Sequence, residues 1–126
     1  MTSNVLLDSS VWIEWLTRGK RLSSCQKYMD KYKNVGVPSI VVFEVCRKVA
    51  AKVSEDEALR VAAWLRSYGI LNLTDEIALH AVDLSLSLKL GMADSLVLAH
   101  AQRENAQLVT LDDDFAAIKS VIVLRS

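Results

Sequence analysis

The chain has 126 residues, a length that suits one domain with a single hydrophobic core. Hydrophobic residues make up 52% and charged residues 24%, which excludes an intrinsically disordered chain. The 15 basic and 15 acidic residues cancel, so the net charge does not indicate a nucleic-acid partner, and such an indication must come from local clusters. We therefore expect one domain over residues 1–126.

The sequence indicates neither a membrane span nor a secretory signal. No apolar run approaches the roughly 18 residues that cross a bilayer, and the first residues lack the pattern of a signal peptide. The two cysteines, Cys25 and Cys46, fit free thiols in a reducing compartment. We expect a cytoplasmic protein that does not contact membranes.

Short apolar runs alternate along the chain with segments of helical periodicity. The runs predicted as strands are 4–8, 35–38, 70–73, 107–111 and 121–124. The segments predicted as helices are 9–19, 21–34, one that begins at 38–39, 54–69, 74–91, 92–105 and a short one at 115–119. The alternation predicts an α/β layered fold with a mainly parallel sheet of about five strands.

Capping residues suggest where several of these helices begin and end. The expected N-caps are Ser9 or Ser10, Ser39, Thr74, and Ser54 in a capping box with Glu57. The expected helix-ending glycines are Gly19, Gly69 and Gly91.

Acidic residues occur at four places that such a fold would bring to one edge of the sheet. Asp8 ends the first strand, and Asp112, Asp113 and Asp114 follow the fourth. Asp94 lies in the first turn of an apolar helix, and Glu44 interrupts the apolar run of the helix after the second strand. Ligands of parallel sheets bind beyond the carboxyl ends of the strands, near a switch in strand order.

Each acid also has a structural explanation. Glu44 could pair with Arg47 or Lys48 on its own helix. Asp94 could favour a helix dipole or cap the helix, Asp8 could be an N-cap, and the three aspartates at 112–114 could form a polar turn that caps the short helix. Each explanation is sufficient alone. Together they need four coincidences of placement, so we interpret the acids as a site.

Clustered carboxylates repel one another unless protons or cations neutralise them. Mg²⁺ or Mn²⁺ suits such a cluster, because both prefer oxygen ligands and keep several waters. A bound ion of this kind can activate water and stabilise charge on a phosphoryl oxygen. The other common sites lack support: the four glycines are isolated, so no phosphate loop is present, and His80 and His100 have no zinc-site spacing.

Four segments resemble, in order and spacing, the motifs of PIN-domain nucleases: "VLLDSSVWIE", "PSIVVFEV", "LGMADSLVLAHA" and "LVTLDDDF". The length and the acid layout resemble the VapC-type toxins of toxin–antitoxin pairs, and the resemblance covers essentially the whole chain. It implies a single PIN-like domain with a three-layer α/β/α sandwich. It also implies an endoribonuclease that depends on Mg²⁺ or Mn²⁺, an antitoxin partner and a homodimer.

The resemblance also implies roles for individual residues. Asp8, Glu44, Asp94 and Asp112 match the family's acids and become the expected catalytic and metal-binding residues, and Asp114 is expected to assist with the metal. Ser9 and Thr110 match the small hydroxyl residues that orient carboxylates or waters. How Asp112, Asp113 and Asp114 divide the work stays open.

An acidic pocket repels RNA, so basic residues must hold the strand. Arg18, Lys20 and Arg21 are the expected RNA contacts, although a solvated surface explains them equally well. Arg47 and Lys48 are the next candidates. The sequence does not indicate which RNA is cleaved or whether one or two ions bind.

Aromatic residues suggest further surfaces. Of Trp12 and Trp15, one is expected in the core and one on an interaction surface, and Trp64 and Leu65 are candidates for a partner surface.

Two alternatives to the ribonuclease stay open. One is a catalytically silent module that binds a cation or a basic peptide. The other is a nuclease or phosphatase with the same site and another substrate.

Overall fold

Five short strands form one parallel sheet in the computed structural model, which describes residues 4–124. The strands are β1 (Asn4–Leu7), β2 (Asn34–Pro38), β3 (Gly69–Leu71), β4 (Gln107–Thr110) and β5 (Val121–Val123). Their order across the sheet is β3-β2-β1-β4-β5, and all four pairs are parallel. The predicted α/β fold with a parallel five-stranded sheet is confirmed.

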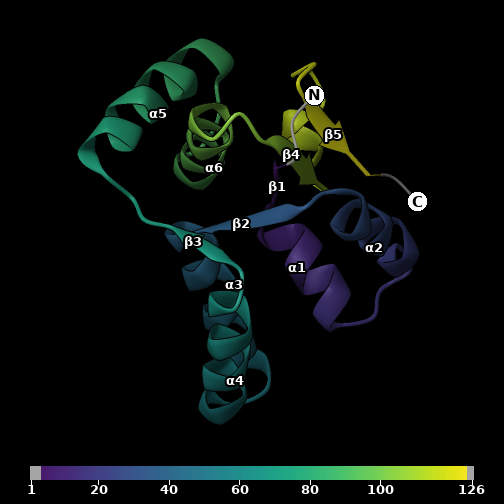
Figure 1. Cartoon of the computed structure of the whole chain (residues 1–126). Helices are drawn as coiled ribbons and strands as arrows, with labels where there is room; N and C mark the ends of the chain where they lie inside the picture. Colours follow the sequence, from purple (N-terminus) through teal and green to yellow (C-terminus); the bar gives the residue numbers. More distant parts are fainter. Residues whose placement is uncertain (1–3, 125–126) are drawn as a thin grey trace.

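Helices connect the strands and cover both faces of the sheet. They are α1 (Ser9–Leu16), α2 (Leu22–Lys31), α3 (Ser39–Lys52), α4 (Glu55–Arg66), α5 (Asp75–Leu88) and α6 (Met92–Arg103), with a 3₁₀ turn, η1 (Asp113–Phe115). Figure 1 shows α5 and α6 together on one side of the sheet, and α1, α3 and α4 on the other. This is the expected three-layer arrangement. Right-handed crossovers explain it, because the chain changes direction across the sheet after β3.

The change of direction locates the switch point of the sheet. The chain passes from β1 outward to β2 and β3, and then returns to place β4 on the opposite side of β1. Strands β1 and β4 are therefore neighbours whose connections leave on opposite faces. The carboxyl ends of these two strands are where a parallel sheet of this type leaves a crevice for ligands.

The register of β1 and β4 places the two key loops beside each other. Leu7 is paired with Val109, and the backbone N–H of Asp8 donates to the carbonyl of Val109 at 3.2 Å. Helix α1 is fixed on β1 by the indole N–H of Trp12, which donates to the carbonyl of Leu7 at 3.0 Å. The side chains of Leu7, Val109 and Trp12 are completely buried, so the floor beneath the crevice is part of the core.

The N-cap of α1 is Asp8, so the expectation of Ser9 or Ser10 was wrong. The Asp8 carboxylate accepts hydrogen bonds from the backbone N–H groups of Ser10 and Val11. Asp8 precedes both serines, and its carboxylate satisfies two of the N–H groups in the first turn of α1 that have no acceptor within the helix. The expected caps Ser54 and Thr74 are confirmed, because their side chains accept from the N–H groups of the residues three positions later.

Ser39 is not an N-cap, because the strand β2 runs on to Pro38 and α3 begins directly at Ser39. Its hydroxyl instead donates to the carbonyl of Leu71, the last residue of β3, and to the side chain of Asn72. The prediction of a short helix over residues 115–119 is also wrong. The turn η1 lies earlier, because the Asp112 carboxylate accepts from the N–H of Asp114 and starts it there.

The three glycines expected to end helices lie beyond the helix ends. Helices α1, α4 and α5 end at Leu16, Arg66 and Leu88, and the left-handed residue after α5 is Lys89. Gly91 is the N-cap of α6, immediately before the helix that carries Asp94. Within residues 4–124, no helix is long and apolar enough to cross a membrane.

Candidate functional site

Asp8 is held at the end of β1 by four hydrogen bonds. One carboxylate oxygen accepts from the backbone N–H of Ser10 at 3.1 Å, from that of Val11 at 3.4 Å, and from the Ser10 hydroxyl. The other oxygen accepts from the Thr110 hydroxyl. Asp8 is only 6% exposed, and burial is the main reason that its pKa is raised; the hydrogen bonds from Ser10 and Thr110 oppose that rise.

The two hydroxyls also organise the loop after β4. The Ser10 hydroxyl accepts from the N–H of Leu111 at 3.0 Å, and the Thr110 hydroxyl accepts from the N–H of Asp112 at 3.0 Å. Each hydroxyl thus donates to Asp8 and accepts from the loop. The network therefore fixes the position of Asp112, just after β4, relative to Asp8.

Ser10 was missed as a site residue by sequence reasoning, which chose Ser9 because it directly follows Asp8. In the structure Ser10 hydrogen-bonds Asp8, whereas the side chain of Ser9 hydrogen-bonds Glu44 and lowers its pKa. The signal was present in the sequence, because an aspartate N-cap faces the residue two positions later. Thr110 lies where sequence reasoning expected it, with its hydroxyl on the carboxylate of Asp8.

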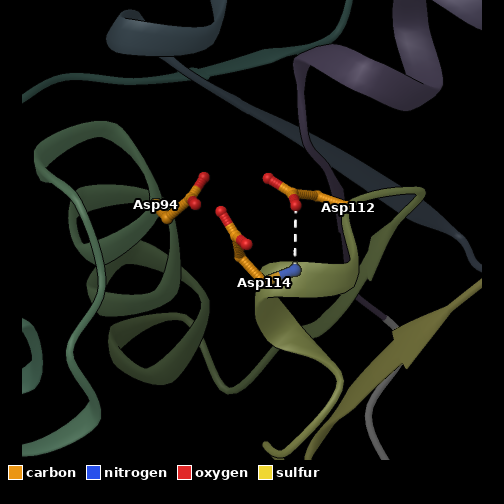
Figure 2. Close-up of side chains that lie close together, drawn as sticks. All are labelled: Asp94, Asp112 and Asp114. Atoms are coloured by element: carbon orange, nitrogen blue, oxygen red, sulfur yellow. Dashed lines mark hydrogen bonds between the residues drawn. The ribbon is translucent and has the colours of Figure 1, made fainter.

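Three aspartates form a tight group above this network. One carboxylate oxygen from each of Asp94, Asp112 and Asp114 lies within 4.8 Å of the other two. Figure 2 shows the three carboxylates turned toward a common space, Asp94 from α6 and the other two from the turn after β4. A hydrogen bond of 2.9 Å from the N–H of Asp114 to the carboxylate of Asp112 holds this turn together.

The electrostatic neighbourhood of Asp94 includes all the other expected acids. Burial raises its pKa from 3.8 to about 6, with further contributions from the charges of Asp112, Asp8, Asp114 and Glu44, in that order. Asp8 and Glu44 are outside the group of three, yet close enough to repel Asp94. The structure therefore brings the predicted acids to one edge of the sheet, and it groups Asp114, which was expected to assist with the metal, with Asp94 and Asp112.

Glu44 is half-buried at the side of this group. Burial is the largest cause of its raised pKa, the Ser9 hydrogen bond opposes the rise, and the charge of Asp8 adds to it. None of the ion pairs formed by residues 4–124 includes Glu44. The alternative of a helical ion pair with Arg47 or Lys48 therefore finds no support in the structure.

The basic loop of Arg18, Lys20 and Arg21 lies at the other end of α1. This helix has eight residues, so the loop is separated from Asp8 by roughly 12 Å of helix. Arg21 is also paired with Glu14 at 3.4 Å. The structure does not bring these residues to the acids, and their contact with RNA stays a prediction.

The aromatic residues form an internal cluster. Trp12 is completely buried, as expected of one of the two tryptophans, and it stacks on the half-buried Trp15 with ring centroids 5.9 Å apart. A part for Trp15 in an interaction surface stays a prediction. Trp64 packs edge-on against Trp12 at 5.2 Å. Leu65 is completely buried, so it cannot belong to the partner surface for which it was a candidate.

The donor set fits a hard divalent cation. The three grouped side chains offer only carboxylate oxygens, and they repel one another: burial is the main reason that the pKa of Asp94 is raised, and the charges of Asp112 and Asp114 add to the rise. Mg²⁺ and Mn²⁺ favour such oxygens and are commonly bound through a few carboxylates with water completing the shell. The group also lies where the β1–β4 switch point places a ligand.

Comparisons with known proteins agree on one family. The model of the PIN domain matches residues 5–121. A toxin–antitoxin complex from Klebsiella pneumoniae contains a chain of 26% identity and TM-score 0.79, with 94% of this chain and 96% of that chain covered. No curated protein sequence gives a significant match.

Two further solved structures share the fold at lower identity. A VapC toxin of Mycobacterium tuberculosis, described as cleaving the sarcin–ricin loop, is 17% identical with a TM-score of 0.76, over 97% of this chain and 99% of that chain. A VapBC complex of Rickettsia felis bound to promoter DNA is 19% identical with a TM-score of 0.75, over 96% and 97%.

We predict that Asp94→Asn raises the stability of the metal-free protein at pH 7. A raised folded-state pKa stabilises the fold below the unfolded pKa of about 4, and this contribution is lost as pH rises through about 6. Thermal melting in EDTA at pH 5 and pH 7 should show a smaller loss for the variant than for the wild type. Asp83→Asn, on the exposed face of α5, is the control; an equal gain there would contradict the prediction.

We also predict that Ser10→Ala destabilises the fold by about 1–2 kcal/mol, because it removes one of the four hydrogen bonds that Asp8 accepts and leaves the N–H of Leu111 without its hydroxyl acceptor. Ser9→Ala should cost less, since Ser9 lies outside the Asp8 network. Urea unfolding in EDTA measures both variants. Equal losses would show that Ser10 has no special part in joining β1 to β4.

Proposed function

This chain belongs to the PIN-domain family, and we propose that it is an endoribonuclease dependent on Mg²⁺ or Mn²⁺. The observation that carries the proposal is the group of three aspartate carboxylates at the switch point, backed by the buried Asp8 and the half-buried Glu44. Such a group has little use in a protein without a cation, because its charges repel one another.

Asp94, Asp112 and Asp114 would hold the ion, since their oxygens are the closest together. Asp8 can add to the set through the oxygen that accepts a single hydrogen bond, from Thr110. Glu44 completes the acidic pocket from α3. When bound, the ion would supply an activated water and offset the negative charge that develops on a phosphate during hydrolysis.

The chain's own residues have a division of labour in this proposal. Ser10 and Thr110 keep Asp8 in one orientation, and through the N–H groups of Leu111 and Asp112 they keep the loop after β4 at a constant distance from it. Glu44, whose carboxylate accepts a hydrogen bond from Ser9, would orient a water beside the ion. Asp94, Asp112 and Asp114 would act on the phosphate only through the bound cation, because without a cation their negative charges repel it.

The relatives support a proposal for the biological role. The similar solved structures include a toxin–antitoxin complex and a VapBC complex, and a related toxin is described as cleaving the sarcin–ricin loop. We infer that this chain is the toxin of a toxin–antitoxin pair, acting on RNA in the cytoplasm as a homodimer and restrained by a cognate antitoxin. We also propose that Arg18, Lys20 and Arg21 contribute to RNA binding.

We predict that Asp94→Asn and Asp112→Asn each reduce cleavage roughly a hundredfold or more, because each removes a ligand charge without changing the side chain's shape. The antitoxin-free protein is incubated with total RNA in Mg²⁺, Mn²⁺ or EDTA, and the cleaved ends are mapped. Cleavage that persists in EDTA would overturn the metal dependence. Single- and double-stranded DNA and a phosphate monoester, assayed in parallel, test the substrate class.

We predict that Glu44→Gln reduces cleavage at least tenfold while leaving the melting temperature unchanged or higher, because Glu44 forms no ion pair within residues 4–124 and its half-buried charge is unfavourable. The matched control is Glu57→Gln on α4, which breaks a surface pair with Arg60 of 2.8 Å. That variant should lose only a few tenths of a kcal/mol and cleave normally. The opposite pattern would make Glu44 a structural residue.

A further inference from the structure

A groove of about 510 Å³ runs along the contact between α1 and α3, beginning at the acidic site. Ser9 and Ile13 line one wall from α1. The wall from α3 is lined by Phe43, Glu44, Arg47, Lys48, Ala51 and Lys52. Ser9 and Glu44, the hydrogen-bonded pair beside the acids, are therefore also the inner end of this α1–α3 groove.

The α3 wall is a continuous stripe with a change of charge along it. Arg47 and Lys48 lie three and four residues after Glu44, and Ala51 and Lys52 lie seven and eight residues after it, which places the five residues on one face of the helix. The negative residue is at the end near the site, and three cations follow it outward. From Glu44 to Lys52 the helix rises roughly 12 Å, which gives the stripe more length than one phosphate group needs.

The three cations have no visible structural task. Arg47, Lys48 and Lys52 are exposed, and none of them belongs to an ion pair formed within residues 4–124. The loop at the far end of α1 differs, because Arg21 there is engaged by Glu14. Unpaired cations next to an acidic site supply what that site lacks, a positive surface for a polyanion.

Phe43 adds an apolar face to the same groove. Its side chain is 60% exposed, at the position before Glu44, although the surrounding α3 residues Val41 and Val45 are completely buried. An exposed aromatic ring beside a row of cations is the combination on which proteins that bind single strands stack bases and track the backbone. A double helix keeps its bases stacked inward and could not use this ring.

We propose that the α1–α3 groove binds the single-stranded RNA segment next to the phosphate that is cleaved. Arg47, Lys48 and Lys52 contact its phosphates, and Phe43 stacks on one base. The inference rests on the proposed ribonuclease function and adds the path that the substrate takes. A strand in this groove passes Glu44, one of the expected acids, and the three cations offset the repulsion that the acids impose on RNA.

The test is RNA binding without cleavage. Protein carrying Asp94→Asn is titrated onto a fluorescently labelled, mixed-sequence single-stranded RNA, and anisotropy is measured at several salt concentrations. Adding Arg47→Ala, Lys48→Ala and Lys52→Ala should weaken binding and make the slope of log affinity against log salt shallower by roughly 0.7 for each phosphate that is no longer neutralised. Phe43→Ala should weaken binding about fivefold or more without changing the salt slope, and Phe43→Trp should retain it.

The matched control removes three exposed lysines outside the groove, Lys27, Lys31 and Lys33. It changes the net charge equally and should alter affinity and slope far less. A second comparison replaces Arg18, Lys20 and Arg21 with alanine. The inference is overturned if the groove variant binds like its parent, if the control loses as much, if the Asp94→Asn protein binds no RNA, or if double-stranded RNA of the same sequence binds equally well.

Cleavage assays separate this inference from the function on which it rests. If the wild type cleaves RNA and the groove variant cleaves and binds normally, the groove is wrong and the ribonuclease stands. If the wild type cleaves nothing with either ion but the groove variant still loses affinity, the ribonuclease is wrong and the groove is an RNA-binding surface. A groove that binds only a protein partner would leave RNA affinity unchanged in the variant, which contradicts the proposal.

Discussion

The buried carboxylate of Asp8 is the interaction on which the rest of the site depends. It caps α1, it accepts hydroxyl hydrogen bonds from Ser10 and Thr110, and it joins the end of β1 to the end of β4. A carboxylate without partners would be too costly to bury there. With four donors it stabilises the two strand ends, and the same hydroxyls fix the loop that presents Asp112. The cap and the site are one structure, so the structural and functional explanations of Asp8 do not compete.

The position of the site explains why the protein tolerates its acids. Asp94 is in the first turn of α6, a helix whose following residues from Ser95 to Ala101 are all buried. The core therefore fixes that end of the helix, and Asp94 cannot move away from Asp112 and Asp114. Packing energy from the apolar helix offsets the repulsion among the carboxylates. The pKa of Asp94 is raised to about 6, mainly by burial and in addition by the charges of the neighbouring carboxylates.

Sequence patterns predicted the parallel sheet and the edge at which the acids meet, because strand runs, caps and the places of Asp8 and Asp94 are local signals. They did not predict which serine faces Asp8. Neighbouring serines differ only in the direction that their side chains take from the first turn of a helix, and the cap geometry decides it. The sequence also did not reveal how far the loop at Arg18 lies from the acids. Ten residues are few along the chain, but a helix makes them a rigid spacer.

Helix dipoles reduce the charge of the site but cannot cancel it. Helices α1 and α3 begin directly after β1 and β2, at the edge of the sheet where Asp8 lies, and Asp94 lies in the first turn of α6. Each helix start contributes about half a positive charge, so the three together amount to roughly one and a half. Asp8, Glu44, Asp94, Asp112 and Asp114 carry more negative charge than that when all are ionised. Protons can supply part of the difference, as the pKa of Asp94 indicates, but at neutral pH most of it is left for a divalent cation. The fold thus provides enough positive potential to assemble the carboxylates and too little to neutralise them, which is the electrostatic balance that the proposed divalent cation would complete.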